Sequence, residues 1–366
     1  MNEYVNNTIN CSFRCNTLSD EEKEKIVSNY IDENVLELKK IAEKKKVLPV
    51  VGKLMISLGL ELKYWQTQYD YFLNRNNSIV SLLTEIFQKF ALHGIRRICV
   101  YENFGALLSA GSDIALYSSG DVDLYADVQD KVLITQVLSK FSYFPTKDDN
   151  DARDICTEYL NKENGIIRIN VAWKPLIRYS IPIGIDAKKY FCWEQMGYYK
   201  DTLIRLPSPN TLLYMCFLRI AIHGYSRSPD IRLYIDTYNS TVNNPNWEEV
   251  LSYAKNDGVV TKFVTVAAIA QDLIGISVPK RVIEISKNDP NSKRILDITY
   301  DFKKHTLVYD PSGLKLLKVE AASDQRSVLA EVFCMLFPPR KWLEEYYMDK
   351  GGPWYSKYFN YYNRLF

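Results

Sequence analysis

The chain has 366 residues, of which 47% are hydrophobic and 25% are charged, and its formal net charge is +2. These proportions are ordinary for a globular protein and exclude a disordered chain, while the small net charge gives little long-range attraction to nucleic acid. A chain of this length exceeds the usual size of one hydrophobic core, so we expect two or three structural units.

The cysteines and the hydropathy pattern bear on the cellular compartment. Seven cysteines are scattered along the chain, and Cys99 and Cys216 lie inside apolar segments. This usage is typical of reduced thiols rather than of a disulfide framework. Cys11 and Cys15 lack a second Cys or His pair at the spacing of a zinc site. No signal peptide is recognised, and no apolar run approaches the about 20 residues of a membrane helix, so we expect a cytoplasmic protein.

The first 91 residues have a helical pattern. Ser19 followed by Glu22 is a capping-box sequence and predicts that a helix begins there. The apolar stripe that follows has a break near Asn34. Its members are Ile26, Tyr30, Val35, Leu38 and Ile41. Two further helices are expected over residues 52–72 and 78–91, packed around the core that follows.

Residues 92–205 mix strand and helix patterns, which predicts an α/β core. A strand is expected over residues 95–101 and a helix over 106–110, with Gly105 at the junction. A glycine there lets backbone amides approach a phosphate, and a helix N-terminus favours its negative charge. The other expected elements are a helix over 132–138 and a strand pair over 155–160 and 166–173, joined by a turn at Asn164 and Gly165.

The most informative segment is 118–125, where two carboxylates alternate with apolar residues after a turn of small residues. The strand period of two places Asp121 and Asp123 on one face, while Val122 and Leu124 point into a core. Mg²⁺ takes oxygen ligands and is commonly held by one or two carboxylates together with substrate phosphates. The pair therefore predicts a site for Mg²⁺, with Mn²⁺ as the alternative ion. The competing interpretation is a solvated strand edge, because Asp-x-Asp also arises by chance.

From residue 206 onward the pattern is helical again. Asn210 is expected to cap a helix over 211–223, and Asn246 to introduce one that begins at Trp247. A third helix is expected over 259–274. The aromatic side chains of residues 346–366 fit either an anchored tail or a surface that stacks on a base or sugar.

Two charged residues in this helical part, four positions apart, are candidates for the site. Arg232 and Asp236 share one helical face. This spacing fits an intrahelical ion pair, and it fits equally the lining of a cleft.

The acidic segment resembles the nucleotidyltransferases of the DNA polymerase β superfamily, whose signature is a glycine-containing helix start followed by an Asp-hydrophobic-Asp-hydrophobic strand. More narrowly, it is similar to a bacterial branch in which Lys-Gly opens the helix and Arg-x-x-Gly-Asp-Ile-Asp-Leu ends the turn. The matching residues are Gly105, Gly120, Asp121, Val122, Asp123 and Leu124. The resemblance continues in the later segments 206–214, 231–236 and 273–279, and it covers about residues 80–285.

The resemblance implies an α+β fold, in which a mixed β-sheet core at 92–205 is flanked by helical lobes at 1–91 and 206–366. It implies a metal-dependent transfer of a nucleotidyl group from a nucleoside triphosphate to a small-molecule or peptide acceptor. Asp121 and Asp123 would hold the metal. The residues expected to line the nucleotide site are Gly105, Ser119, Gly120, Arg232 and Asp236.

Four positions depart from the family pattern, one of which is Ala172 in place of a His. Phe104 stands in place of the Lys and Tyr117 in place of the Arg, so two phosphate-binding cations are missing. The third catalytic acid falls on Asn170, whose amide can offer an oxygen to Mg²⁺ but cannot accept a hydroxyl proton as a carboxylate does. The base must then come from elsewhere. The candidates are Glu158, Asp201 and Asp236.

These departures leave two alternatives open. The first is a glycosyltransferase, since a nucleoside-diphosphate sugar presents its diphosphate to the same metal, and it would release a nucleoside diphosphate instead of pyrophosphate. The second is a degenerate, non-catalytic binding protein whose thermal stability no nucleotide changes. Neither a membrane nor nucleic acid is an expected partner.

Overall fold

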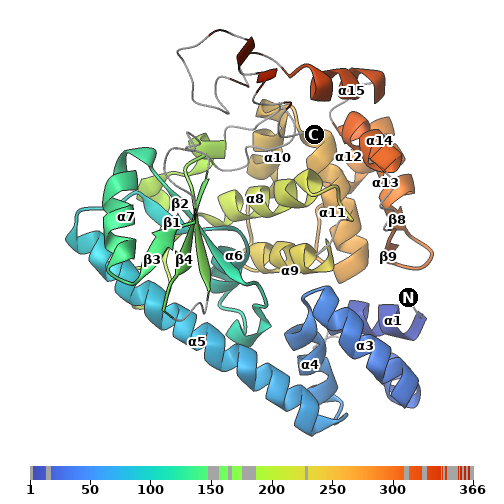
Figure 1. Ribbon diagram of the computed structural model, residues 1–366. Helices are drawn as coiled ribbons and strands as arrows, with labels where there is room; N and C mark the ends of the chain where they lie inside the picture. The colour runs from blue at the N-terminus through green and yellow to red at the C-terminus, as the bar shows by residue number, and fades with distance from the viewer. Residues whose placement is uncertain are drawn as a thin grey trace.

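The structure of the protein is a computed structural model. It describes residues 3–13, 18–146, 156–163, 167–174, 187–226, 230–308, 313–323 and 328–338, with a few residues between 340 and 362. The chain forms a small mixed β-sheet with helices around it, which confirms the expected α+β fold (Figure 1). Cys15, the turn at Asn164 and Gly165, and most of the aromatic segment 346–366 lie outside the described residues. Within the described part, no helix has the length and apolar character that crossing a membrane requires.

In the described part of the chain, five helices precede the sheet. They are α1 (Glu3–Ser12), α2 (Asp20–Ser28), α3 (Asp32–Lys44), α4 (Leu48–Ser57) and α5 (Leu62–Leu92). The capping box is confirmed, because the Ser19 hydroxyl accepts a hydrogen bond from the Glu22 amide and the Glu22 carboxylate accepts one from the Ser19 amide. The helical pattern is interrupted a few residues before the predicted position near Asn34. The chain breaks at residues 29–31, and Asn34 lies inside α3, where its side chain donates to the Asn29 carbonyl at 2.9 Å.

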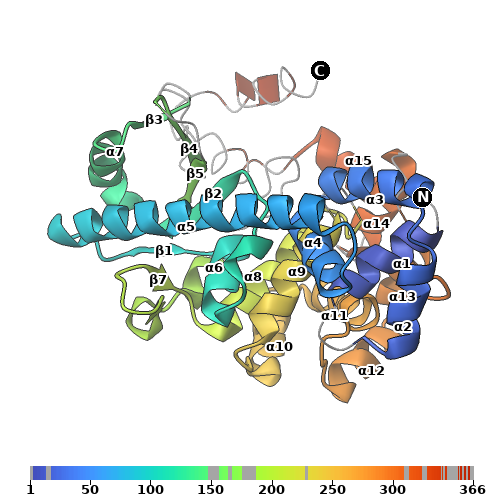
Figure 2. The same ribbon diagram turned by 90° about the horizontal axis from the view of Figure 1, so that it is seen from below.

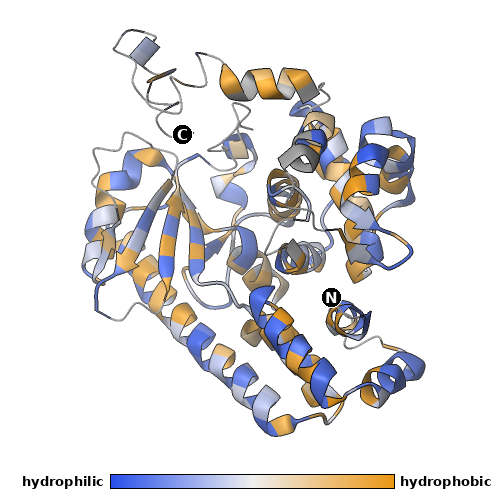
Figure 3. Ribbon diagram, turned by 45° about the vertical axis from the view of Figure 1, so that its right-hand side comes forward, coloured by the Kyte–Doolittle hydropathy of each residue, from blue (hydrophilic) through white to orange (hydrophobic). Residues whose placement is uncertain are grey.

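The expected helices over 52–72 and 78–91 have other bounds in the structure. The chain turns at residues 58–61, where Gly59 has a φ of +70°, and α5 then continues without interruption. Its buried residues include Ile79, Leu83 and Phe90, which recur at helical spacing, and the helix runs alongside the sheet (Figure 2). In Figure 3 hydrophobic (orange) and hydrophilic (blue) residues are interspersed along the N-terminal helices, which fits helices that bury one face.

The central sheet has the strand order β1-β2-β5-β4-β3. Its strands are β1 (Ile98–Val100), β2 (Asp121–Ala126), β3 (Tyr143–Pro145), β4 (Cys156–Asn161) and β5 (Arg168–Ala172). β2 and β5 are parallel, and the other neighbours are antiparallel. The alternating residues Val122 and Leu124 of β2 pack in one core with α5, α6 (Glu102–Ala110) and α7 (Lys131–Ser139). Asp121 and Asp123 therefore point to the opposite face.

In the described part of the chain, eight helices follow the sheet, and the first of them packs on the side of the sheet that carries the two aspartates. They are α8 (Pro209–Ile222), α9 (Asp230–Thr241), α10 (Trp247–Asn256), α11 (Val260–Ile274), α12 (Lys280–Asn288), α13 (Pro290–Thr299), α14 (Gly313–Ser323) and α15 (Val328–Leu336). Short hairpins are formed by β6 (Gly197–Tyr198) with β7 (Arg205–Leu206) and by β8 (Tyr300–Asp301) with β9 (Thr306–Leu307). Met215 of α8 packs against Tyr125 of β2 and Phe191 in one buried cluster.

One predicted cap is wrong and another is confirmed. Ser208 rather than Asn210 caps α8, because the helix begins at Pro209, whose missing N–H suits the first helical position. The Asn210 side chain instead accepts a hydrogen bond from the Asn246 amide at 2.7 Å. Asn246 caps α10 as expected, accepting from the Glu249 amide.

The buried side chains form three large clusters, one among the N-terminal helices, one between the sheet and α5, and one among the C-terminal helices. Ile231 and Ile235 of α9 belong to the N-terminal cluster, so the elements are interlocked. The division into domains at 1–91, 92–205 and 206–366 stays a prediction.

Gly105 lies where α6 crosses the end of β1. A Cβ atom there would be 2.7 Å from the Val100 carbonyl oxygen, whereas one on Gly120 would meet nothing within 4 Å. We expect Gly105→Ala to lower the free energy of unfolding by about 1–3 kcal/mol, the usual cost of overpacking. Gly120→Ala should change it by less than about 0.5 kcal/mol. Urea unfolding of both variants checks this, and equal stabilities would contradict the packing role of Gly105.

Asp113 ties the N-terminal helices to the core. Its carboxylate accepts hydrogen bonds from Tyr69 of α5 at 2.6 Å and Lys53 of α4 at 3.0 Å. Burial raises the pKa of Asp113, but these hydrogen bonds outweigh burial and leave the pKa below its usual value. The stabilisation is therefore complete above the unfolded-state pKa of about 4 and is lost as the pH falls through the lower folded-state pKa.

We expect Asp113→Asn to lower the free energy of unfolding by about 1–3 kcal/mol at pH 7, since a charged hydrogen-bond acceptor is lost. The difference from the unaltered chain should shrink as the pH falls below about 4, where the carboxyl also becomes neutral. Urea unfolding at several pH values measures both quantities. A difference that stays constant down to acid pH would show that the carboxylate charge is not involved.

Candidate functional site

Asp121 and Asp123 converge on the side chain of Asn170. The parallel register of β2 and β5 places Asn170 opposite Asp123. The amide nitrogen of Asn170 lies 3.0 Å from one Asp121 carboxylate oxygen and 3.1 Å from one Asp123 carboxylate oxygen, and it donates to both. All three side chains are partly buried. The three predicted catalytic positions thus meet on one face of the sheet.

The turn before β2 is held from several sides. The Ser119 hydroxyl donates to the Asp121 carboxylate, and the Arg75 guanidinium of α5 donates to the Ser119 carbonyl. The Tyr117 hydroxyl donates to the Asp121 carbonyl. Burial and the negative charges of Asp123 and Asp121 raise the pKa of Tyr117 well above its usual value, so this hydroxyl remains a donor. Gly120 is exposed beside the acid pair, with open space where a side chain would be.

Arg219 of α8 is a site residue that the sequence did not reveal. Its guanidinium forms an ion pair with Glu102, donates to the Asn103 side chain at 2.6 Å and lies 3.4 Å from an Asp123 carboxylate oxygen. Burial, together with the positive charge of Arg232, lowers its pKa to about 10, so it remains a cation at neutral pH. No spacing rule links position 219 with position 123, and only the packing of α8 on the sheet brings them together.

Glu102 begins α6 in a left-handed conformation, with a φ of +54°. A residue with a Cβ atom adopts this conformation at a cost of about 1–3 kcal/mol, and such strain is concentrated at functional sites. The Glu102 side chain is 11% exposed and reaches Arg219. The start of α6 is therefore held in a strained form beside Asp123.

The two positions where the family pattern has cations form one packing unit. Phe104 is fully buried and its ring centroid lies 4.5 Å from that of Tyr117, inside the core between the sheet and α5. A charged side chain at either position would meet an aromatic ring in a dry core. Arg219 and Arg232 instead supply positive charge to the acid pair from α8 and α9, and both influence neighbouring pKa values there.

Arg232 and Asp236 are both 7% exposed and lie near the acid pair. No hydrogen bond or ion pair joins these two described residues, and one Asp236 carboxylate oxygen and the Arg232 Nε have no partner in the described part of the chain. Burial raises the pKa of Asp236 to about 6, and Asp121 adds to this effect while Arg232 and Arg219 oppose it. The intrahelical ion pair is therefore not formed, and each side chain keeps one buried polar atom without a partner among the described residues.

The three candidates for the missing base have different surroundings. Glu158 of β4 lies opposite Asn170 in the antiparallel register, so its side chain is on the same face as the acid pair. It is 37% exposed and pairs with Arg168 at 3.0 Å. Asp201 is exposed in the hairpin between β6 and β7, and Asp236 is a buried residue of α9. Of the three, Glu158 combines the shared face with access to solvent.

The donor set around the acid pair suits a hard cation. Burial and the nearby Asp121 charge raise the pKa of Asp123 above its usual range, while the hydrogen bond from Asn170 opposes this effect. The Asn170 amide nitrogen occupies the point that both carboxylates face, and rotation of the amide would present its oxygen there instead. Among the described residues, no group of three His, Cys, Asp or Glu side chains is close enough to hold a metal by itself. A metal would thus take two carboxylates and the amide from the protein.

Comparison with known proteins gives one family and one solved structure. The family whose model is described as uncharacterised nucleotidyltransferase matches residues 32–275, a range that runs from α3 to the end of α11. The solution structure of the antibiotic-resistance factor ANT(2″)-Ia is 9% identical, covering 50% of this chain and 91% of that chain with a TM-score of 0.35. No curated protein matches. The family match gives no support to the alternative of sugar transfer.

Proposed function

Because the chain belongs to the uncharacterised nucleotidyltransferase family, we propose that it transfers a nucleotidyl group from a nucleoside triphosphate to a small-molecule or peptide acceptor. The observation that carries this proposal is the convergence of Asp121 and Asp123 on Asn170 on the face of the sheet that also bears Glu158. Different neighbouring side chains would then bind the nucleotide, orient its phosphates and accept the proton of the acceptor hydroxyl.

Asp121 and Asp123 would hold Mg²⁺ or Mn²⁺, with the Asn170 amide oxygen as a further ligand. When bound, such an ion supplies positive charge that stabilises the triphosphate and the departing pyrophosphate. Arg219 and Arg232 would take the place of the two missing cations and orient the phosphates from α8 and α9. The open space at Gly120 would admit a phosphate beside β2, and Ser119 would keep the Asp121 carboxylate in its orientation.

The acceptor oxygen attacks the α-phosphorus, a new P–O bond forms and the bond to the β-phosphate oxygen breaks, so that pyrophosphate leaves. We assign the acceptor proton to Glu158, since Asn170 cannot take it and Glu158 is next to it on the same face. Arg168 pairs with Glu158 and would keep its carboxylate oriented. The close approach of Gly105 to the Val100 carbonyl oxygen gives this glycine a role in the packing of α6. Its role in phosphate binding stays a prediction.

Glu158→Gln is expected to lower kcat about 10²–10⁴-fold, the usual range for loss of a general base. The dissociation constant of the magnesium–nucleotide complex should stay within about twofold, because in this proposal Glu158 acts on the acceptor and holds neither the metal nor the phosphates. Glu163→Gln, in an exposed position just after β4, is the matched control. Steady-state rates and equilibrium nucleotide binding separate the two effects, and an unchanged kcat would exclude Glu158 as the base.

The function itself is tested by incubating the protein with each nucleoside triphosphate, a panel of hydroxyl-bearing acceptors and Mg²⁺. We expect release of pyrophosphate and none after addition of EDTA. Release of a nucleoside diphosphate from a sugar nucleotide would support sugar transfer instead. The melting temperature should rise with Mg²⁺ and the correct nucleotide, because a ligand that binds only the folded state stabilises it. No rise with any nucleotide would favour the non-catalytic alternative.

A further inference from the structure

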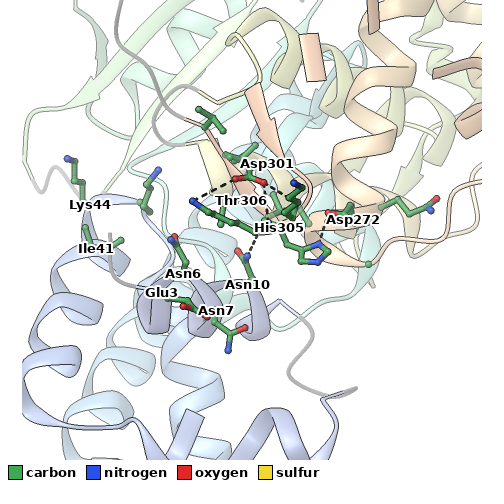
Figure 4. A pocket seen from close by; sticks show the side chains of 18 residues that line it. Glu3, Asn6, Asn7, Asn10, Ile41, Lys44, Asp272, Asp301, His305 and Thr306 are labelled. Atoms are coloured by element: carbon green, nitrogen blue, oxygen red, sulfur yellow. Dashed lines mark hydrogen bonds and ion pairs between the residues drawn. The ribbon is translucent and has the colours of Figure 1, made fainter. Parts of the chain in front are cut away.

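A groove of about 1550 Å³ lies between the N-terminal helices and the β8–β9 hairpin (Figure 4). One wall is α1, which contributes Asn6, Asn7 and Asn10. The other walls are the C-terminal end of α3, the end of α11 and the hairpin residues 301–308. None of the residues that surround Asp121 and Asp123 lines this groove, so it is separate from the proposed nucleotide site.

The acidic side chains on the hairpin side are already satisfied by close neighbours. The Asp272 carboxylate accepts from the Tyr300 hydroxyl at 2.6 Å and contacts the His305 ring nitrogen at 2.8 Å (Figure 4). The Asp301 carboxylate accepts from the backbone amides of Lys303 and Lys304 within the turn. These two carboxylates therefore already have donors supplied by the protein.

Two of the four lysines that line the groove have no such partners among the described residues. Within the described part of the chain, the side chains of Lys44 on α3 and Lys303 on the hairpin have no ion pair or hydrogen bond. They approach the groove from two walls, whereas Glu3 at the start of α1 is its one acid without a described partner. Unpaired ammonium groups on two sides of a cavity favour an anionic ligand that both can reach.

The amides of α1 add hydrogen-bonding capacity next to these charges. The Asn10 side chain donates to the His305 carbonyl at 2.6 Å and so fixes α1 against the hairpin. The Asn6 side chain has no hydrogen bond to a described residue and points into the groove between Lys44 and the hairpin (Figure 4). An amide both donates and accepts, which suits hydroxyl groups.

We propose that this groove binds a phosphorylated, hydroxyl-bearing small molecule of the sugar-phosphate class. Its phosphate is held by the Lys44 and Lys303 ammonium groups, and its hydroxyls by the Asn6 amide. The volume exceeds what one such molecule fills, so bound water completes the groove. This is a second binding site, independent of Asp121 and Asp123.

The test uses glucose 6-phosphate, ribose 5-phosphate and glycerol 3-phosphate as probes, with glucose and inorganic phosphate as partial ligands. Binding to the full chain is measured by calorimetry in EDTA, which removes divalent metal from the acid pair. We expect saturable binding of at least one sugar phosphate, tighter than that of either partial ligand. Absence of binding by all three probes would overturn the proposal.

The double variant Lys44→Gln, Lys303→Gln should bind the same probe at least about tenfold more weakly. The matched control is Lys255→Gln with Lys293→Gln, two exposed lysines on α10 and α13, which should bind normally. Asp121→Asn with Asp123→Asn should also bind normally, which separates this site from the proposed nucleotide site. Equal binding by both lysine pairs would refute the groove assignment, and loss of binding in the aspartate variant would place the probe in the acid pair.

Discussion

Replacing both Asp121 and Asp123 with asparagine is expected to lower nucleotidyl transfer by at least about a thousandfold, which corresponds to about 4 kcal/mol of transition-state stabilisation. Among the described residues, these two carboxylates are the groups that accept hydrogen bonds from the Asn170 amide. Amides in their place carry no charge to attract Mg²⁺. The Mg²⁺-dependent rise in melting temperature with nucleotide should disappear together with the activity.

The fold should survive this double substitution. Asparagine has nearly the shape of aspartate, and the removal of two neighbouring charges relieves their repulsion, while Arg219 keeps its partner Glu102. Circular dichroism and urea unfolding check this point. Asp201→Asn, which alters an exposed aspartate in the β6–β7 hairpin, is the control and should retain activity. Full activity in the Asp121 and Asp123 double variant would refute the metal-binding assignment.

Arg219→Met is expected to lower the free energy of unfolding by about 3–5 kcal/mol. The substitution leaves the buried Glu102 carboxylate without its cation, and an uncompensated buried charge is the costly consequence of breaking such a pair. It also removes a positive charge from the proposed phosphate site, so nucleotide binding should weaken in the fraction that remains folded. Urea unfolding and nucleotide titration measure the two effects separately.

A double-mutant cycle tests whether the unpaired Glu102 charge causes this loss of stability. Glu102→Gln with Arg219→Met removes both charges, and its stability should lie above that of Arg219→Met alone. Arg281 offers a matched comparison, because its pair with Glu248 is 61% and 56% exposed, and Arg281→Met should cost less than about 1 kcal/mol. If Arg219→Met were no more costly than Arg281→Met, the ion pair with Glu102 would not contribute to stability.

Local sequence patterns predicted the elements that short-range rules control. The Ser19 capping box, the Asn246 cap and the strand pair β4–β5 follow from the contacts of a few neighbouring residues, and each is confirmed. The predictions of helix ends were wrong where two local signals, such as two possible capping residues, are about equally strong. Asn210 and Ser208 are both good caps, and Pro209 decides between them. The turn at residues 58–61 was missed because apolar residues continue through it.

The sequence by itself determined that Asp121 and Asp123 share one face, because a strand alternates its side chains whatever it packs against. It also placed Asn170 and Glu158 on strands that follow. Only the tertiary structure decided that Arg219 reaches Glu102 and Asp123, that Phe104 packs on Tyr117 and that Glu158 stands beside Asn170. These contacts depend on the register of the strands and on how α8 packs against the sheet and α6. Neither is encoded in the spacing of residues along the chain, so the charges that surround the acid pair appear only once the helices are packed.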